Sequence, residues 1–206
     1  MSRIPTLAIL VAAAFAAGCS QSAEIVGNTC TPTAAMTMWQ RAPDTVCILD
    51  VRTPAEFIFM GHAPMARNIP FKFLTNEWDA KNCKPAMALN PQFLDEVKKF
   101  YQPADTLLLM CASGKRGAGA VKLLRASGYT RAYNIEGGFD GQRGKDCSSR
   151  GAGKLIKSGW RTSRLVWTMS INPESLYLPG GRPTPALTAK ADMPALADNQ
   201  ARRSLR

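Results

Sequence analysis

A short apolar segment that ends in a glycine-rich, basic loop constrains the fold of this chain more than any other feature. Residues 106–110 read Thr-Leu-Leu-Leu-Met, and residues 111–117 read Cys-Ala-Ser-Gly-Lys-Arg-Gly. The apolar run predicts an interior strand, and the stretch from Gly117 to Ser127 predicts a helix that ends at Gly128. A strand that turns directly into a helix is a building unit of parallel α/β sheets.

The turn between this predicted strand and helix carries Cys111. Free N–H groups and the positive dipole end at a helix N-terminus favour a thiolate, as do the cations of Lys115 and Arg116. A small-residue loop with two glycines can wrap its amides around an anion, whereas a cysteine that only packs in the core needs no such loop. We therefore predict that Cys111 is a nucleophile. Its predicted anion-binding residues are Ala112, Ser113, Gly114, Lys115, Arg116 and Gly117.

The rest of the chain alternates between strand-like and helix-like segments. Residues 33–40 have a helical composition, and residues 45–49 and 132–135 are apolar and strand-like. Asn90 and Pro91 predict the start of a further helix through capping and first-turn chemistry. This alternation predicts a single α/β domain, with a parallel sheet flanked by helices and ligands at the carboxyl ends of the strands.

Two longer segments interrupt the alternation. Residues 75–89 and the glycine-rich, basic residues 137–153 are predicted to be inserted loops that lie over the same edge of the sheet. The parallel arrangement brings the ends of all strands to that edge. We expect both insertions close to Cys111.

The first 18 residues have the pattern of a signal peptide. A basic start at residues 1–3 precedes an apolar stretch at residues 7–17 and the small residues before Cys19. The stretch is shorter than the roughly 20 residues that span a bilayer. The residues before Cys19 resemble the lipobox of bacterial lipoproteins, which implies a lipid on Cys19 and a periplasm-facing position in the bacterial envelope. Ser20 favours the outer membrane, and an ordinary signal peptide is the alternative.

These observations predict how the chain is divided. We expect a signal peptide at 1–18, a lipid-anchored tether at 19–32, one domain at 33–170 and a mostly disordered, flexible tail at 171–206. The tail contains proline, alanine and polar residues in place of an apolar pattern.

Export to an oxidising compartment would permit disulfides among the other cysteines. Four of them allow three pairings, and the sequence does not choose among these. Since the segments that carry Cys83 and Cys147 should emerge beside Cys111, we hypothesise a bridge between Cys83 and Cys147. Cys47 lies in a predicted strand and is expected to pack in the core. A redox role, in which Cys111 pairs with Cys83 or Cys147, is an alternative.

The chain carries a formal net charge of +11, which favours anionic partners. The basic residues concentrate between Arg143 and Arg164, where Asp146 is the single acidic residue. This stretch lacks interleaved aromatic residues and a recognition helix, so nucleic acid is not an expected partner. Small anions or an anionic membrane surface fit better. The sequence shows no metal-ligand spacing, and we expect neither a metal nor a cofactor.

Two separated segments resemble the rhodanese-like sulfurtransferase family. Residues 48–57 (ILDVRTPAEF) and 61–70 (GHAPMARNIP) resemble its N-terminal signature. Residues 111–116 (CASGKR) resemble its active-site loop, and residues 134–139 (NIEGGF) resemble the strand and double glycine that follow. The resemblance extends over residues 33–167 and implies the rhodanese-like fold.

The resemblance also implies a reaction. Cys111 would take the outer, sulfane sulfur of a small anionic donor such as thiosulfate or polysulfide and hold it as a persulfide. A thiophilic acceptor, such as a thiol or a thioredoxin-like protein, would then remove the sulfur. Four residues separate Cys111 from Arg116, whereas cysteine-dependent phosphatases have five, so sulfur transfer is the favoured chemistry. A non-catalytic binding module for an envelope partner or an anion is the alternative.

Other residues of the two segments are expected to serve structure. Asp50 and Arg52 should pair at the end of a strand, and His62 should form a hydrogen-bonded turn near the site. The chain departs from the common family pattern at Ala112, Gly117 and Phe139, where relatives often carry arginine, serine or threonine, and tryptophan. These departures leave the preferred sulfur donor open.

Overall fold

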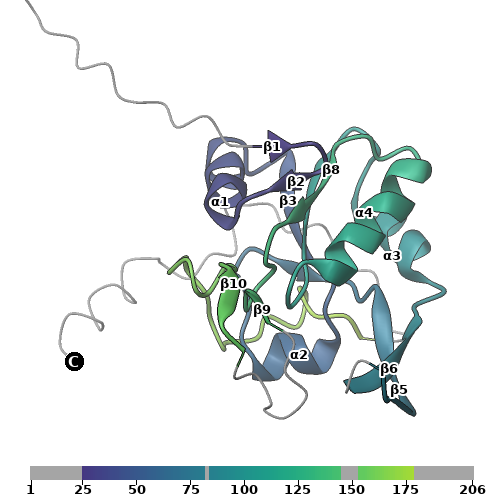
Figure 1. Cartoon of the computed structure of the whole chain (residues 1–206). Coiled ribbons are helices and arrows are strands. Elements are labelled where there is room, and N and C mark those ends of the chain that lie inside the picture. The colour runs from purple at the N-terminus through teal and green to yellow at the C-terminus, as the bar shows by residue number, and fades with distance from the viewer. Residues whose placement is uncertain (1–24, 82–83, 145–152, 179–206) are drawn as a thin grey trace, which may run out of the picture.

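The computed structural model describes residues 25–81, 84–144 and 153–178 (Figure 1). The predicted signal peptide, the predicted lipidation site Cys19, the hypothesised Cys83–Cys147 pair and most of the predicted tail lie outside the described residues. Within the described ranges, no helix has the length and apolarity that crossing a membrane requires.

A six-stranded sheet forms the centre of the domain, in the order β1-β2-β8-β7-β3-β4. Strands β2, β8, β7, β3 and β4 run parallel, and β1 pairs antiparallel with β2. Strand β7 is buried along its whole length, as its unbroken apolar sequence predicts. The strands are β1 (Ile25–Val26), β2 (Thr29–Cys30), β3 (Val46–Asp50), β4 (Arg67–Asn68), β7 (Thr106–Met110) and β8 (Ala132–Ile135).

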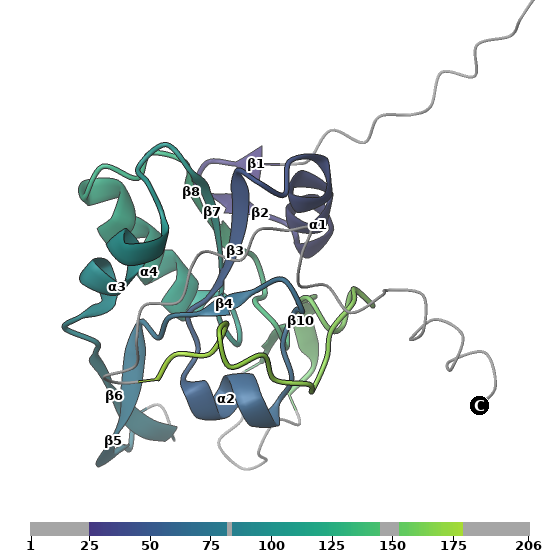
Figure 2. The ribbon, with the colours of Figure 1, turned by 180° about the vertical axis from the view of Figure 1, so that it is seen from behind.

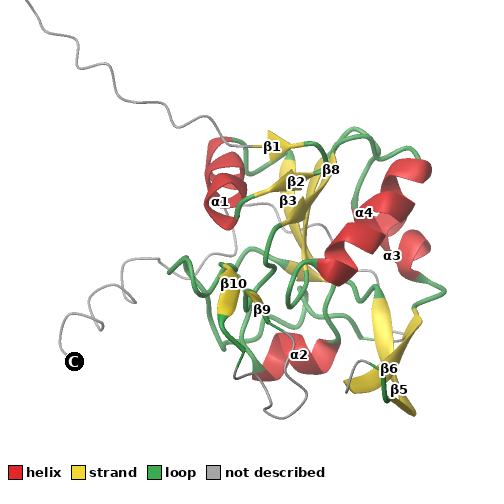
Figure 3. Ribbon diagram, viewed as in Figure 1, coloured by secondary structure: helices red, strands yellow, loops and turns green. Residues whose placement is uncertain are grey.

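Helices cover both faces of this sheet (Figures 1 and 3). Helices α3 and α4 pack on one face through Val97, Val121 and Leu124, and α1 packs on the other through Ala35 and Trp39. Helix α2 lies at the carboxyl ends of the strands. The helices are α1 (Pro32–Arg41), α2 (Pro54–Phe59), α3 (Phe93–Phe100) and α4 (Lys115–Ala126). The predicted α/β fold with a mainly parallel sheet is confirmed.

Two helix starts differ from the sequence prediction. Helix α3 begins at Phe93, because the Asn90 side chain forms a turn instead of a cap: its Oδ1 accepts from Gln92 N, and its Nδ2 donates to Pro70 O. Helix α4 begins at Lys115, two residues before the predicted Gly117, because Gly114 ends the preceding loop in a left-handed conformation.

Antiparallel strands occupy parts of the two predicted loops, so the prediction of loops was wrong there. Strands β5 (Lys72–Asp79), which begins just before the first predicted loop, and β6 (Lys84–Leu89) form one pair. Strand β9 (Gln142–Arg143), inside the second predicted loop, pairs with β10 (Leu155–Lys157), which follows that loop. Hydrogen bonds between the backbones of neighbouring strands hold each hairpin. Because such bonds do not require a regular apolar pattern of side chains, the sequence gives little sign of these strands. In Figures 1 and 2, α2 lies between the two hairpins.

The domain extends beyond its predicted boundaries at both ends. At the N-terminal end, β2 lies within the predicted tether, yet it pairs with β8, and Cys30 is buried. At the C-terminal end, Asn68 N donates a 2.7 Å hydrogen bond to Ser175 O, and Tyr177 is buried. Figure 2 shows this C-terminal segment crossing the molecule past β4 toward the β5–β6 hairpin. The tether and tail predictions were therefore wrong for residues 25–32 and 171–178.

Candidate active site

Cys111 lies directly after β7, in the turn that leads into α4. Its side chain is almost fully buried, and its Sγ accepts a 3.1 Å hydrogen bond from the backbone N–H of Gly114. Gly114 has a φ of +89°, a conformation that favours glycine. The turn thus directs an amide of the helix N-terminus at the sulfur, which can stabilise negative charge there.

The remaining loop residues differ in their surroundings. Lys115 is exposed, and Ala112 and Ser113 are half-buried. Gly117 is buried and close to strand β8, because a Cβ on Gly117 would lie 2.2 Å from Oδ1 of Asn134. Gly117 therefore allows close packing behind the loop, and Asn134 is a neighbour of the site that the sequence reasoning missed.

Arg116 has a partner that the sequence did not reveal. Its guanidinium makes two hydrogen bonds to Glu56 of α2, with Nη1–Oε2 at 2.7 Å and Nη2–Oε1 at 2.5 Å. Burial raises the pKa of Glu56, but the bonds from Arg116 and Thr53 lower it more, so the net pKa lies below its usual value. Arg116 therefore joins the loop to α2, and its charge is matched by a carboxylate.

The predicted pair of Asp50 and Arg52 forms a fully buried ion pair beneath α2. Arg52 Nε lies 3.0 Å from each carboxylate oxygen of Asp50, and Arg52 Nη2 lies 2.7 Å from Oδ2. Arg52 Nη2 also donates to Gly61 O at 2.8 Å, and its Cζ lies 4.2 Å from the centre of the Phe139 ring. The pair fixes the segment after β3 and the start of the loop that follows α2.

His62 is buried in a turn, as its place in the sequence pattern predicts. Its ring stacks on Phe57 with 3.8 Å between ring centres, and Nδ1 lies 3.2 Å from Phe57 O. Its backbone bridges to Thr168 in both directions. Burial lowers the pKa of His62, which favours the neutral form of the ring. These contacts indicate a structural role for His62.

The segment after β8 supports the Cys111 loop from behind. Phe139 N donates to Cys111 O at 2.6 Å, and Asp140 N donates to Ala112 O at 2.9 Å. Asp140 Oδ1 in turn accepts a 2.7 Å bond from Arg161, and burial raises the pKa of Asp140. Sequence reasoning did not select Asp140 or Arg161. Their position after the double glycine was the available signal for Asp140, whereas no local signal marks Arg161.

Two other described cysteines have free thiols inside the domain. Burial raises the pKa of Cys30 to about 12. Burial and the nearby Asp105 raise the pKa of Cys47 to about 11. Cys47 packs against the core, as predicted. Both thiols therefore stay protonated at neutral pH, and neither lies in a loop of free amides. No group of metal-ligating side chains occurs in the part of the chain that the structure describes.

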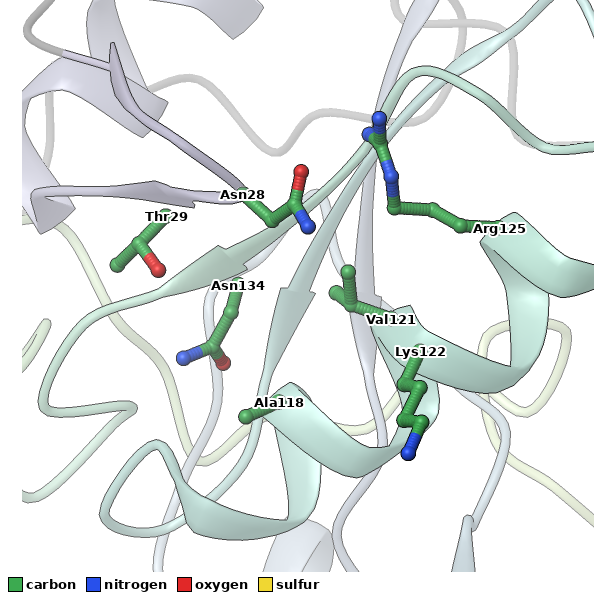
Figure 4. A pocket seen from close by; sticks show the side chains of 7 residues that line it. All are labelled: Asn28, Thr29, Ala118, Val121, Lys122, Arg125 and Asn134. Atoms are coloured by element: carbon green, nitrogen blue, oxygen red, sulfur yellow. The ribbon is translucent and has the colours of Figure 1, made fainter.

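A separate cleft of about 390 Å³ lies between α4 and the β2–β8 side of the sheet (Figure 4). Asn134 lines it, and the Asn134 Oδ1 atom has no hydrogen-bond partner among the described residues. Cys111 does not line this cleft, so we do not assign it to the reaction. Its lining residues are Asn28, Thr29, Ala118, Val121, Lys122, Arg125 and Asn134.

Comparison with known proteins places this geometry in a family. Residues 33–145, more than half of the chain, match the rhodanese-like domain. This chain is a rhodanese-like domain protein. The match includes the Cys111 loop, α2 with Glu56, and the double glycine after β8. It ends before β10, so the buried Trp160 and the site neighbour Arg161 lie beyond the family match.

Named relatives of this rhodanese-like domain protein include sulfurtransferases. Thiosulfate sulfurtransferase 18 of Arabidopsis thaliana is 38% identical over 93 residues, which cover 44% of this chain and 62% of the plant protein. Thiosulfate:glutathione sulfurtransferase of Saccharomyces cerevisiae is 30% identical over 112 residues, which cover 53% of this chain and 70% of the yeast protein. The chain thus spans less than two thirds of the length of the plant relative.

A solved structure supports the same fold. Rv0390 from M. tuberculosis is 26% identical, superposes with a TM-score of 0.50, and covers 68% of this chain and 96% of its own. The fold expected from the sequence resemblance is confirmed.

Proposed function

We propose that this rhodanese-like domain protein is a sulfurtransferase that carries a sulfane sulfur as a persulfide on Cys111. The observation that carries the proposal is the Gly114 N–H that donates to Sγ of Cys111 at the N-terminus of α4. Amides at such a position stabilise a thiolate and then a persulfide anion. The names of the plant and yeast relatives support the same class of reaction.

The proposed first step uses a dianionic donor such as thiosulfate. The Cys111 thiolate attacks the outer sulfur, the S–S bond of thiosulfate breaks, and sulfite leaves with the bonding electrons. The sulfur stays on Cys111 as a persulfide anion within reach of the loop amides. Since the proposed step starts from the thiolate, it needs no general base. The exposed Lys115 draws the anionic donor toward the loop.

The proposed second step restores the enzyme. An acceptor thiolate attacks the outer sulfur of the persulfide, the S–S bond to Cys111 breaks, and Cys111 leaves as a thiolate. Such a double displacement gives ping-pong kinetics. The yeast relative is named for transfer to glutathione, which supports a thiol as acceptor. We propose thiosulfate or polysulfide as donor and a small thiol or a thioredoxin-like protein as acceptor.

Intact-mass spectrometry tests this function. The reduced chain is treated with thiosulfate, desalted and weighed, with Cys111→Ser in parallel. We expect a gain of one sulfur atom that a thiol reverses in the parent, and no gain in Cys111→Ser. If the folded parent, with Cys111 reduced, gains no sulfur from thiosulfate or polysulfide, the result contradicts the proposed sulfurtransferase function. If that parent still binds these anions, the result supports the alternative, a non-catalytic binding module.

We also propose that the protein works in the bacterial cell envelope and faces the periplasm. A lipid on Cys19 would anchor it there as a lipoprotein of the outer membrane. The support is the signal-like sequence of residues 1–18 and the lipobox-like residues before Cys19. Labelling of cells with a radioactive fatty acid tests the anchor. We expect label on the parent and none on Cys19→Ala. Without the lipid, Cys19→Ala should no longer be found in the membrane fraction.

A further inference from the structure

The β9–β10 hairpin extends from one point beside the Cys111 loop. The two ends of the insertion meet closely, because a Cβ on Gly159 would lie 2.3 Å from Gly141 N. The sheet of this hairpin contains β9 and β10 alone. The hairpin is therefore an addition to a continuous domain, attached at its base.

The described surface of this hairpin is basic and partly apolar. Arg143 and Lys154 are exposed, and Ile156 exposes 60% of its surface. No acidic side chain occurs among its described residues, 142–144 and 153–157, and Lys157 pairs with Glu136 outside the hairpin. A two-stranded ribbon with exposed apolar residues gains little stability by itself. Its composition suits contact with an acidic macromolecule that has an apolar centre.

Backbone hydrogen bonds connect the base of the hairpin to Cys111. Trp160 N donates to Gly138 O at 2.7 Å, and Arg161 N donates to Phe139 O at 2.9 Å. Phe139 N then donates to Cys111 O at 2.6 Å. A single loop, residues 137–140, thus separates the hairpin from the residue that holds the sulfur. A macromolecule on the hairpin lies beside the catalytic edge.

We propose that the β9–β10 hairpin is the docking surface for the sulfur acceptor, a thiol protein with an acidic surface around its reactive cysteine. The inference rests on the proposed function, in which the acceptor thiolate must reach the persulfide on Cys111. Arg143 and Lys154 attract the acidic partner, and Ile156 provides an apolar contact. A membrane bound to the hairpin would cover the edge of the sheet through which the acceptor must reach Cys111. We therefore assign the hairpin to the acceptor protein and not to a membrane.

Two double variants of the full chain test the docking surface. Lys154→Glu/Ile156→Ser changes the hairpin, and Lys122→Glu/Leu123→Ser makes the same kind of change on exposed residues of α4. Turnover is measured with thiosulfate and two acceptors: cyanide, and a reduced thioredoxin of net negative charge. For the hairpin variant we expect the KM for thioredoxin to rise about tenfold, with cyanide turnover unchanged. The α4 variant should match the parent with both acceptors.

Two outcomes would overturn the docking surface. The first is an equal KM for thioredoxin in the hairpin variant and the parent; if the variant also loses binding to phosphatidylglycerol vesicles, the hairpin is assigned to a membrane. The second is an equal loss with thioredoxin and cyanide, which assigns the hairpin to the fold. A parent that is inactive with both acceptors and gains no sulfur on Cys111 contradicts the proposed function instead. Docking is then decided by thioredoxin binding to the Cys111→Ser chain with and without the hairpin changes.

Discussion

At the residue scale, the cation of Arg116 has a different task from the one its position suggests. Its guanidinium is bound by both oxygens of Glu56, which also accepts from Thr53 N and thereby completes the capping box of α2. Arg116 therefore holds α2 against the Cys111 loop. Lys115 is the exposed cation of the pair. In the proposed function it is therefore the cation that attracts the anionic donor.

Replacing Glu56 by glutamine should change how stability depends on pH. The folded-state pKa of Glu56 is lowered, so its stabilising effect is present above its unfolded pKa and is lost as pH falls through the folded pKa. We expect Glu56→Gln to lose about 1.5–3 kcal/mol at pH 7 and to approach the parent below about pH 4. Urea unfolding from pH 3 to 7 measures this. Exposed Glu77→Gln should follow the parent, and parallel curves for Glu56→Gln and the parent would contradict the ion pair.

The second prediction at the residue scale concerns Arg52. Lysine cannot reproduce the fork that joins Asp50 and Gly61 O, nor the guanidinium stacking on Phe139. We expect Arg52→Lys to lose about 3 kcal/mol in the free energy of unfolding, because a buried carboxylate is left poorly paired. Chemical denaturation measures the loss. Arg131→Lys, on an exposed site, should cost less than about 0.5 kcal/mol; equal losses would show that Arg52 makes no special contribution.

At the scale of elements, the site is a stack of three segments. The Cys111 loop rests on residues 137–140, and these rest on residues 158–161. Gly138 stands at the first contact with a φ of +60°, where a Cβ would lie 2.1 Å from Cys111 O. The double glycine after β8 is thus required by close backbone contact as well as by conformation.

Gly138→Ala and Gly27→Ala separate these two requirements. Gly27 has a φ of +59° and nothing within 4 Å of its added Cβ, so alanine there meets conformational strain alone. We expect Gly27→Ala to cost about 1 kcal/mol with sulfur transfer retained. Gly138→Ala should cost at least about 2 kcal/mol more and reduce kcat, because the Cys111 loop must move. Thermal unfolding and cyanide turnover measure both effects, and identical behaviour would exclude the backbone contact as the cause.

At the scale of the molecule, the described domain continues past the predicted end at residue 170. Arg67 Nη1 donates to Glu174 O at 2.6 Å, and Tyr177 is buried beside Phe73. The C-terminal segment thus connects β4 to the β5–β6 hairpin. It forms part of the folded unit, although the family match ends at residue 145.

Two truncations test this boundary. A chain that ends after Leu178 keeps these contacts, whereas a chain that ends after Ser170 loses them. We expect the shorter chain to lose about 3 kcal/mol, which corresponds to a fall in Tm of about 6–12 °C. The longer chain should unfold within about 2 °C of the parent. Equal Tm values for the two truncated chains would show that residues 171–178 do not stabilise the domain.

The sequence alone determined the strand and helix around Cys111, the buried strands of the sheet and the close pair of Asp50 and Arg52. These features depend on apolar runs, on glycine conformation and on residues two positions apart, all of which act locally. The tertiary structure decided the partner of Arg116, which lies 60 positions away in α2, and the support of the Cys111 loop by residues near Arg161. Such contacts depend on which surfaces the folded sheet brings together, and no local pattern in the chain encodes that choice.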